Sequence, residues 1–318
     1  MTKPVVLLFG QIHEDAIALL KEKAEIRMAR NLAESSLVAE VADVEGIIVR
    51  AEGAVTRRII ENAPHLKVVG RHGVGVDNVD VEAATEHGVY VVNTPWAPVE
   101  PVAEHVLGMM IALSKNILRT DKALRQGHWE ARHKYIGQTL FGKTLGIVGF
   151  GRIGQRVAEV CAPFKMTVLY YDLVEQKEAE ERLGAQRVSL EELLRRADYV
   201  SLNTPLTPAT RHLIGRRELA LMKPTAYLIN TARGPVLDES ALIEALREGS
   251  IAGAGLDVYE QEPAPPDNPL FAMPNVVLTP HMASHTKEAM REMSMVVKDI
   301  IAVLEGREPE YPVNRPKG

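Results

Sequence analysis

Short apolar runs alternate with amphipathic stretches along the whole chain, which is the pattern of parallel α/β sheets. A first series of apolar runs lies at residues 5–9, 25–27, 46–49, 67–69 and 89–92. A second series lies at residues 144–148, 166–171, 199–202, 226–229, 252–256 and 276–278. Two such series predict two doubly wound parallel-sheet domains, Rossmann-like or flavodoxin-like, with a cleft between them.

Helical periodicity falls between and after these runs. It predicts helices near residues 14–23 and 153–161, one long apolar helix over 101–126, and another over 287–305. The last of these is long enough to return the chain to the first series. We therefore expect a discontinuous first domain, 1–98 and 285–318, and a second domain over 99–284.

A glycine-rich turn follows the first strand of the second series. In Gly149-Phe150-Gly151-Arg152-Ile153-Gly154 the first glycine would allow the bend, the second would admit a pyrophosphate, and the third would let the helix pack on the strand. The free N–H groups and the dipole at the start of that helix favour an anion. The turn alone would also suit a Rossmann-like fold that binds no nucleotide, so its context decides the prediction.

Asp172 ends the next strand and supplies this context. Its carboxylate is placed to accept hydrogen bonds from the adenosine ribose hydroxyls, whereas a 2′-phosphate would meet like charge. The residues after it are Leu173 and Val174, and neither is an arginine. The sequence therefore predicts NAD rather than NADP. It follows that 99–284 is expected to be an NAD-binding Rossmann domain and that 1–98 with 285–318 is expected to be the substrate domain.

Composition and charge narrow the class of protein. The chain has 318 residues, 46% of them hydrophobic, and a net charge of −5 without a basic patch, which argues against nucleic acid as a partner. The single cysteine, Cys161, falls on the apolar face of a predicted helix and permits no disulfide within one chain. The N-terminus lacks the pattern of a signal peptide, and no stretch is apolar enough for a membrane span. We expect a cytoplasmic protein.

Three side chains at strand ends of the second series are candidates for catalysis. Arg233 can hold a carboxylate with two hydrogen bonds and polarise a neighbouring carbonyl. His281 can exchange a proton near neutral pH, and Glu262 would hold its ring in one tautomer. His281 and His285 are spaced like metal ligands, but no third ligand recurs at suitable spacing and Pro280 opposes a helix there, so no metal is expected.

Other strand ends and one loop of the first series complete the predicted site. Asp257 could accept a hydrogen bond from the nicotinamide carboxamide, and Thr204 and Pro205 would border the cofactor. In the first series, a second glycine-rich loop has the wrong spacing for a nucleotide. Its backbone N–H groups at Val74 and Gly75 can instead form an anion nest for the substrate carboxylate, opposite Arg233.

These motifs, in this order, resemble the D-isomer-specific 2-hydroxyacid dehydrogenases, especially the phosphoglycerate dehydrogenase-like branch. The resemblance covers nearly the whole chain and rests on residues 73–80, 102–105, 149–154, 230–234, 255–263 and 280–281. It implies the Arg233, Glu262 and His281 active site, nicotinamide contacts from Thr231, Ala232 and Asp257, and a homodimer built through the cofactor domains. The expected cofactor contacts are Gly149, Gly151, Arg152, Ile153, Gly154, Asp172, Thr204, Pro205, Thr231, Ala232, Arg233, Asp257, His281, Ala283 and Ser284.

The resulting prediction is an NAD-dependent oxidoreductase that interconverts a 2-oxo acid and a D-2-hydroxy acid, with His281 as acid and base. The substrate stays open among 3-phosphoglycerate, hydroxypyruvate, glyoxylate and others. Arg50 favours a phosphate, whereas Ala51, Glu52 and Ala54 do not, and Trp96 departs from the pattern of many relatives. Two alternatives remain: an NAD-dependent formate dehydrogenase, against which Glu262 speaks, and an NAD(H)-sensing binding protein of corepressor type.

Overall fold

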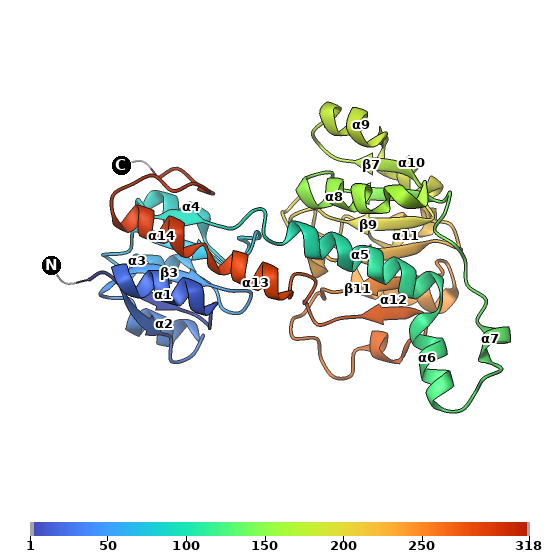
Figure 1. Cartoon of the computed structure of the whole chain (residues 1–318), viewed down its shortest axis with the longest axis horizontal. Coiled ribbons are helices and arrows are strands. Elements are labelled where there is room, and N and C mark those ends of the chain that lie inside the picture. Colours follow the sequence, from blue (N-terminus) through green and yellow to red (C-terminus); the bar gives the residue numbers. More distant parts are fainter. Residues whose placement is uncertain (1–2, 317–318) are drawn as a thin grey trace. The chain divides into compact units, whose positions relative to one another are not determined.

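The computed structural model describes residues 3–316 (Figure 1). Its internal contacts divide them into two units: unit 1 holds residues 3–98 and 284–316, and unit 2 holds residues 99–283. Each unit is built on its own parallel sheet, so the predicted fold class is confirmed. Within residues 3–316, no helix has the length and apolar character that a bilayer span requires.

The sheet of unit 1 has five parallel strands in the order β2-β1-β3-β4-β5. The strands are β1 (Val5–Leu8), β2 (Glu25–Met28), β3 (Val44–Val49), β4 (Val68–Arg71) and β5 (Tyr90–Val92). Helices lie between them: α1 (Glu14–Lys23), α2 (Glu34–Glu40), α3 (Arg57–Glu61) and α4 (Val81–Glu86). The later segment adds α13 (Lys287–Ser294) and α14 (Val297–Leu304).

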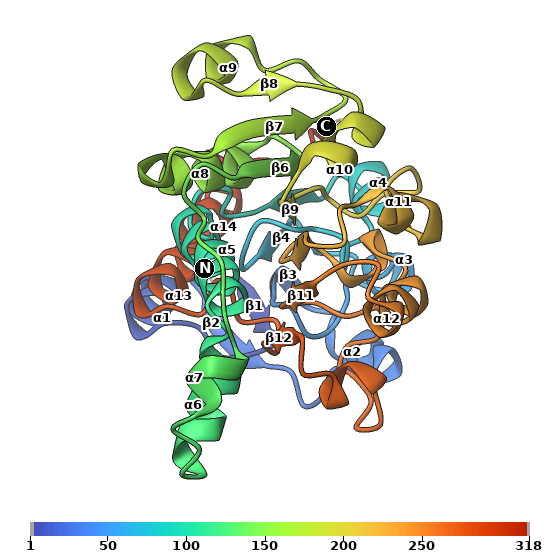
Figure 2. The ribbon, with the colours of Figure 1, turned by 90° about the vertical axis from the view of Figure 1, so that its right-hand side faces the viewer.

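The sheet of unit 2 has seven parallel strands in the order β12-β11-β10-β9-β6-β7-β8. In Figure 2, β8 and β7 lie toward the top of this unit and β12 lies toward its bottom. The strands are β6 (Thr144–Val148), β7 (Thr167–Tyr171), β8 (Gln186–Arg187), β9 (Tyr199–Leu202), β10 (Tyr227–Asn230), β11 (Gly253–Leu256) and β12 (Val276–Leu278). The order reverses at β6, and ligands of such sheets bind outside the carboxyl ends of the strands at this switch point.

The helices of unit 2 include three short 3₁₀ turns. The α-helices are α5 (Val99–Ser114), α6 (Ile117–Arg125), α7 (Ala131–Lys134), α8 (Arg152–Cys161), α9 (Lys177–Leu183), α10 (Leu190–Arg196), α11 (Arg216–Leu221) and α12 (Glu239–Glu248). The 3₁₀ turns are Ala162–Phe164, Gly234–Val236 and Pro269–Ala272.

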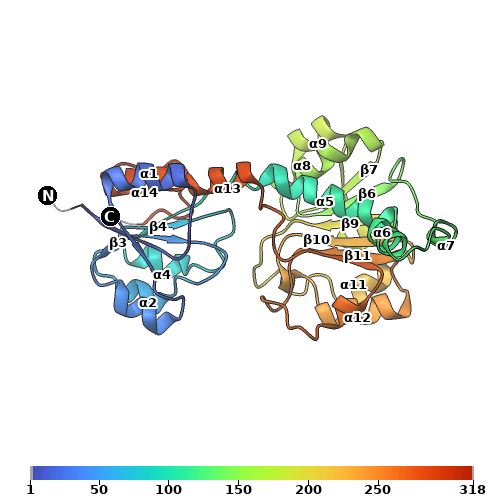
Figure 3. The ribbon, with the colours of Figure 1, turned by 60° about the horizontal axis from the view of Figure 1, so that its bottom comes forward.

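Both sheets are covered by helices on their two faces, which is why their central strands are apolar (Figure 3). The edge strands β2 and β8 carry exposed polar residues. In unit 1, Val6 and Leu8 pack with α1 and α14, whereas Leu7 packs with α2, α3 and α4. In unit 2, α5 and α8 cover one face, and α10, α11 and α12 cover the other. The buried Cys161 of α8 belongs to the first of these layers, and burial raises its pKa to about 12.

Two helices predicted as continuous are each broken into two. The predicted 101–126 helix is α5 and α6, with Asn116 between them in the left-handed region at φ 53°. The predicted 287–305 helix is α13 and α14. In both, a serine closes the first half by donating to the carbonyl four residues earlier, Ser114 to Met110 at 2.5 Å and Ser294 to Met290 at 2.7 Å. Such bonds weaken and bend helices, a local effect that apolar periodicity does not report.

Candidate active site

The predicted site residues of unit 2 follow the carboxyl ends of its strands. The glycine turn follows β6, Asp172 follows β7 and Thr204 follows β9. Thr231 to Arg233 follow β10, Asp257 follows β11 and His281 comes shortly after β12. Because the strands are parallel, these positions share one edge of the sheet.

The three glycines of the turn have different surroundings. Gly149 has φ 91°, and a Cβ there would lie 2.8 Å from the Asn203 backbone. A Cβ on Gly154 would lie 2.2 Å from the Gly149 carbonyl oxygen. A Cβ on Gly151 would meet nothing within 4 Å. Two glycines therefore permit close packing of the chain on itself, and Gly151 leaves open space where a ligand can approach the backbone.

The amino end of α8 meets this open space. Gly151 is its N-cap and has no side chain to accept from the first-turn N–H groups, and Arg152, Ile153 and Gly154 open the helix. An uncapped helix start with a positive dipole end suits a pyrophosphate. The residues present thus fit the phosphate part of a dinucleotide.

Asp172 is tied to the glycine turn through its carboxylate. One oxygen accepts from the Phe150 N–H at 2.7 Å and the other from the Val174 N–H at 3.1 Å. An arginine also lies here, although none follows Asp172 directly. Arg187 of β8 donates from Nη2 to the Asp172 and Leu173 carbonyl oxygens at 2.9 and 3.1 Å. The position of Arg187 is not apparent from the sequence, because 15 residues separate it from Asp172 and β8 has only two residues.

Three buried side-chain oxygens at the same edge have no hydrogen-bond partner among the described residues. They are Asn203 Oδ1, Thr204 Oγ1 and Thr231 Oγ1. A buried polar atom left unpaired costs about 1 to 3 kcal/mol, so such atoms gather where a polar ligand will satisfy them. Thr204 and Thr231 were both expected to contact the cofactor, and their position fits the nicotinamide half of NAD.

His281 and Glu262 form a close polar pair within the predicted catalytic set. Nδ1 of His281 lies 2.6 Å from Glu262 Oε2, and both side chains are about one third exposed. The carboxylate only accepts, so Nδ1 donates and Nε2 faces the other way on the ring. Burial raises the pKa of Glu262, but the hydrogen bond and charge of His281, the Tyr259 N–H and the charge of Arg233 together hold that pKa below its usual value.

The loop that carries His281 is held by Asp257. His281 is in the left-handed region at φ 50°, and its N–H donates to the Asp257 carbonyl at 2.7 Å. The Asp257 carboxylate, 1% exposed, accepts from Thr279 Oγ1 at 2.5 Å and from the Met282 and Ala283 N–H groups at 2.8 Å. Asp257 thus supports the loop from Thr279 to Ala283. In its expected contact with nicotinamide, Asp257 would use a carboxylate oxygen that already accepts from this loop.

A histidine of α5 extends this support. His105 Nε2 lies 3.0 Å from Thr279 Oγ1 and 3.8 Å from Asp257 Oδ1. His105 belongs to one of the motifs on which the family resemblance rests, but no role was predicted for it. Its contact joins α5 to the loop of His281.

Arg233 is positioned by close backbone packing. A Cβ on Gly234 would lie 1.7 Å from the Tyr259 carbonyl oxygen, so only glycine lets the Arg233 loop touch the chain that leads to Glu262. Asn230 donates to the Arg233 carbonyl at 3.0 Å and accepts from the Ala232 N–H at 3.1 Å. The Arg233 guanidinium donates to the Ala232 carbonyl at 2.7 Å, and its charge reaches Glu262.

The remaining predicted residues lie in unit 1 or form backbone hydrogen bonds within the chain. In unit 1, the Gly73 N–H donates to Thr94 Oγ1 at 3.1 Å, beside the predicted nest at Val74 and Gly75. The Ser284 carbonyl accepts from the Thr286 N–H at 3.0 Å. Residues 3–316 contain no cluster of three or more His, Cys, Asp or Glu side chains arranged to hold a metal ion.

Comparison with known proteins agrees with this geometry. A family model described as D-isomer specific 2-hydroxyacid dehydrogenase, NAD binding domain, matches residues 107–283. The chain is 46% identical over 313 residues to D-3-phosphoglycerate dehydrogenase of Methanocaldococcus jannaschii, covering 98% of this chain but only 59% of that protein. It is 42% identical over 323 residues to glyoxylate reductase of Pyrococcus furiosus, covering 98% and 96%.

A solved structure gives the same result. The NADPH-dependent glyoxylate/hydroxypyruvate reductase of Sinorhizobium meliloti, in complex with NADP and malonate, superposes with a TM-score of 0.90 at 32% identity, covering 100% of both chains. The resemblance stated from the motifs is therefore confirmed. In this chain the NAD-binding domain is unit 2. The chain belongs to the D-isomer-specific 2-hydroxyacid dehydrogenases, which are oxidoreductases that use a nicotinamide dinucleotide, here NAD.

Proposed function

We propose that this chain interconverts a small 2-oxo acid and a D-2-hydroxy acid, with Arg233, Glu262 and His281 as its active site. The observation that carries the proposal is the 2.6 Å contact of His281 with Glu262 at the sheet edge that also bears the glycine turn. The names of the relatives support the same reaction class.

Each of the three side chains has a separate role in reduction of the carbonyl. Bound NADH would supply the hydride that reaches the carbonyl carbon. His281 gives a proton from Nε2 to the carbonyl oxygen, and Glu262 keeps the ring oriented while that proton leaves. Arg233 holds the substrate carboxylate with two hydrogen bonds and stabilises the developing charge on oxygen. Oxidation uses the same steps in reverse, with His281 as the base.

Unit 2 provides the cofactor site and unit 1 the substrate domain in this proposal. The N–H groups of residues 151–154 hold the pyrophosphate, and Asp172 holds the ribose hydroxyls. Thr204, Pro205, Thr231 and Ala232 border the nicotinamide, with Asp257, Ala283 and Ser284 beyond them. The N–H groups of Val74 and Gly75 meet the substrate carboxylate.

Glyoxylate and hydroxypyruvate fit this site better than 3-phosphoglycerate. Arg50, the basic residue at the end of β3, donates from Nη1 to the Gln11 carbonyl at 2.6 Å, so part of its hydrogen-bonding capacity is already used. The neighbouring Ala51 and Glu52 add no anion-binding group.

The deciding experiment follows NADH oxidation with a panel of glyoxylate, hydroxypyruvate, pyruvate and 3-phosphohydroxypyruvate. It also follows NAD reduction with formate, with glycolate, which is achiral, and with both enantiomers of each other product. We expect turnover on the unphosphorylated acids and, among the chiral products, on the D-hydroxy acids only. Tight NADH binding without turnover on any 2-oxo acid would instead favour the NAD(H)-sensing alternative. Turnover restricted to formate would favour the formate dehydrogenase alternative.

We also propose a cytoplasmic homodimer assembled through unit 2. The segment from α6 to α7 projects from its unit in Figure 2 and exposes apolar side chains. These are Ile117, Leu118, Leu124, Trp129 and Ile136, the last 83% exposed. A patch of this kind marks a protein interface, and the partner proposed is a second copy. The cytoplasmic location rests on Cys161, a single buried thiol.

Light scattering after gel filtration measures the oligomeric state. We expect a dimer, and we expect Trp129→Glu combined with Ile136→Glu to give a folded monomer. The matched control is Met28→Glu, an exposed apolar residue of unit 1, which should stay dimeric. A monomeric wild-type chain at micromolar concentration would contradict the proposal.

A further inference from the structure

We propose that Arg187 is a cofactor-specificity residue: it stands where it can bind the 2′-phosphate of NADP, and the Asp172 carboxylate is what keeps that phosphate out. The inference rests on the proposed binding of the adenosine ribose at Asp172. It adds that the chain already carries the cation and the donors of a phosphate site.

The register of the sheet places Arg187 beside the ribose position. In the pairing of β7 with β8, Arg187 lies opposite Tyr170, two residues before Asp172. Its side chain is exposed, and it runs to the end of β7, where Nη2 bonds to the carbonyl oxygens of Asp172 and Leu173 at 2.9 and 3.1 Å. The guanidinium is thus fixed against the backbone of the residue that would contact the ribose.

Two backbone donors bind the carboxylate of the same residue, Asp172. The N–H groups of Phe150 and Val174 donate to the two Asp172 oxygens at 2.7 and 3.1 Å. If the carboxylate is removed, both N–H groups lose their acceptor. Together with Arg187 they would form a set of donors suited to an anion, because a phosphate accepts several N–H groups and binds a guanidinium strongly.

The same geometry explains why NAD is preferred in the native chain. The Asp172 carboxylate occupies the two N–H groups and repels a dianionic phosphate at the ribose. The charge of Arg187 offsets part of that repulsion. The native chain therefore discriminates against NADP through the Asp172 carboxylate alone. The residues that directly follow Asp172, Leu173 and Val174, give no sign of the arginine nearby.

Isothermal titration with NAD⁺ and NADP⁺, without substrate, tests the inference by binding alone. The variants are Asp172→Ser, Arg187→Ala and the double variant. We expect Asp172→Ser to tighten NADP⁺ binding by about tenfold or more, the value of one charge-assisted hydrogen bond. The double variant should lose that gain while its NAD⁺ affinity stays within about twofold of Asp172→Ser.

A charge-matched control separates local contact from net charge. Arg195→Ala in the Asp172→Ser background also removes one exposed arginine, which there pairs with Glu191 on α10. It should keep the tightened NADP⁺ binding. High salt should weaken NADP⁺ more than NAD⁺ in Asp172→Ser and equally in the double variant.

Two results would overturn the inference. One is a double variant that binds NADP⁺ as tightly as Asp172→Ser. The other is an Arg187→Ala chain that loses NAD⁺ and NADP⁺ affinity equally, because Arg187 would then only brace the backbone. Failure of the native chain to bind NAD⁺ at all is a different outcome, since it would refute the cofactor site itself.

Discussion

The chemistry of individual residues in this site depends on the backbone conformation that orients their side chains. His281 adopts φ 50°, which a residue with a Cβ seldom does, and it stays there because Asp257 bonds the loop through both its carbonyl and its carboxylate. Glu262 then meets the ring at 2.6 Å. Catalysis by proton transfer depends on this orientation as much as on the imidazole itself.

Removing the imidazole should separate catalysis from cofactor binding. We expect His281→Ala to lower kcat by at least about a hundredfold, since positioned acid–base groups contribute that much. NADH affinity should change by less than about threefold. Stopped-flow turnover and NADH fluorescence titration measure the two quantities, and near-normal turnover would remove His281 from the mechanism.

The matched change at Glu262 should alter pH dependence more than binding. Because the pKa of Glu262 is held below its usual value, the carboxylate stays ionised as the pH falls through the normal range of a glutamate. Glu262→Gln keeps the shape and a hydrogen-bonding oxygen but not the charge. The loss of kcat that protonation of Glu262 causes at acid pH should then be absent from the variant, because its side chain does not titrate. An unchanged profile would contradict the pairing.

The hydroxyl of Thr279 provides a test of loop support. Thr279→Val keeps the side-chain shape but removes the donor to Asp257, which costs about 1 to 3 kcal/mol of local support. We expect kcat to fall by about tenfold or more with little change in NADH affinity, because 1.4 kcal/mol is a factor of ten. Thr279→Ser retains the hydroxyl and should recover most of the activity; equal loss in both variants would exclude this role.

At the scale of elements, the glycine turn shows which glycines serve packing and which serve a ligand. Gly154→Ala should destabilise the chain by about 1 to 3 kcal/mol, since its Cβ would overlap the Gly149 carbonyl and the helix-propensity gain of about 1 kcal/mol is smaller. Gly151→Ala, with φ −75° and open space, should change stability by less than about 0.5 kcal/mol yet weaken NAD binding. Urea unfolding and titration with NAD distinguish them. Equal effects of both on stability would refute the assignment.

Element positions followed from the sequence where periodicity decides them. The strand at residues 199–202 was predicted with its observed bounds, and so was the helix Glu14–Lys23. The breaks after Ser114 and Ser294 were not, since a hydroxyl bonded to its own helix leaves no trace in the apolar pattern. Arg187 escaped notice for a related reason: strand pairing, which sequence order does not display, brings it to Asp172.

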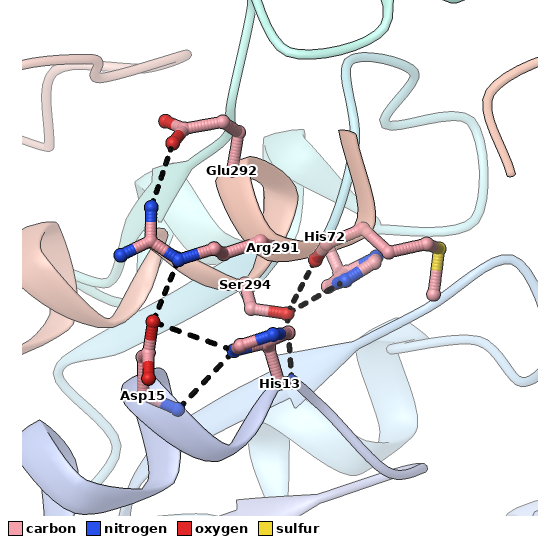
Figure 4. Close-up of polar contacts among 7 residues, drawn as sticks. His13, Asp15, His72, Arg291, Glu292 and Ser294 are labelled. Carbon is pink, nitrogen blue, oxygen red and sulfur yellow. Dashed lines mark hydrogen bonds and ion pairs between the residues drawn. The ribbon is translucent and has the colours of Figure 1, made fainter. Parts of the chain in front are cut away.

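At the scale of the whole molecule, unit 1 is closed by the segment that comes last in the chain. Ser294 of α13 accepts from the His13 N–H at 2.9 Å and lies 3.2 Å from His72 Nε2, as Figure 4 shows. Arg291 bonds Asp15 at 2.6 Å beside them. Since the Ser294 proton goes to Met290, the neutral His72 ring must donate to the hydroxyl oxygen.

Acid should weaken the fold through His72. Burial, with the nearby charges of Arg50 and Arg71, lowers the pKa of His72 from 6.5 to about 4. A lowered pKa means that the unfolded chain binds the proton first, so stability is present in full above pH 6.5 and is lost as the pH falls toward 4. The loss amounts to about 3 kcal/mol.

Urea unfolding at pH 7 and pH 4.5 measures this loss. In His72→Gln, which retains a donor for Ser294 but does not titrate, the difference between the two pH values should shrink by about 2 to 3 kcal/mol. His133→Gln, which removes an exposed histidine of α7, should behave as the native chain. If all three proteins lost the same unfolding free energy between pH 7 and pH 4.5, His72 would not be the responsible group.

The division of unit 1 between residues 3–98 and 284–316 also bears on how the protein is made. A ribosome releases the first five strands of unit 1 early, but Ile300, whose side chain covers Gly46 and Gly70 of the sheet, follows only after all of unit 2. During synthesis, unit 2 is a continuous segment that can fold at once. Until then, α1 alone covers the face of the early strands that α14 will share, so nascent chains arrested before residue 284 should recruit chaperones.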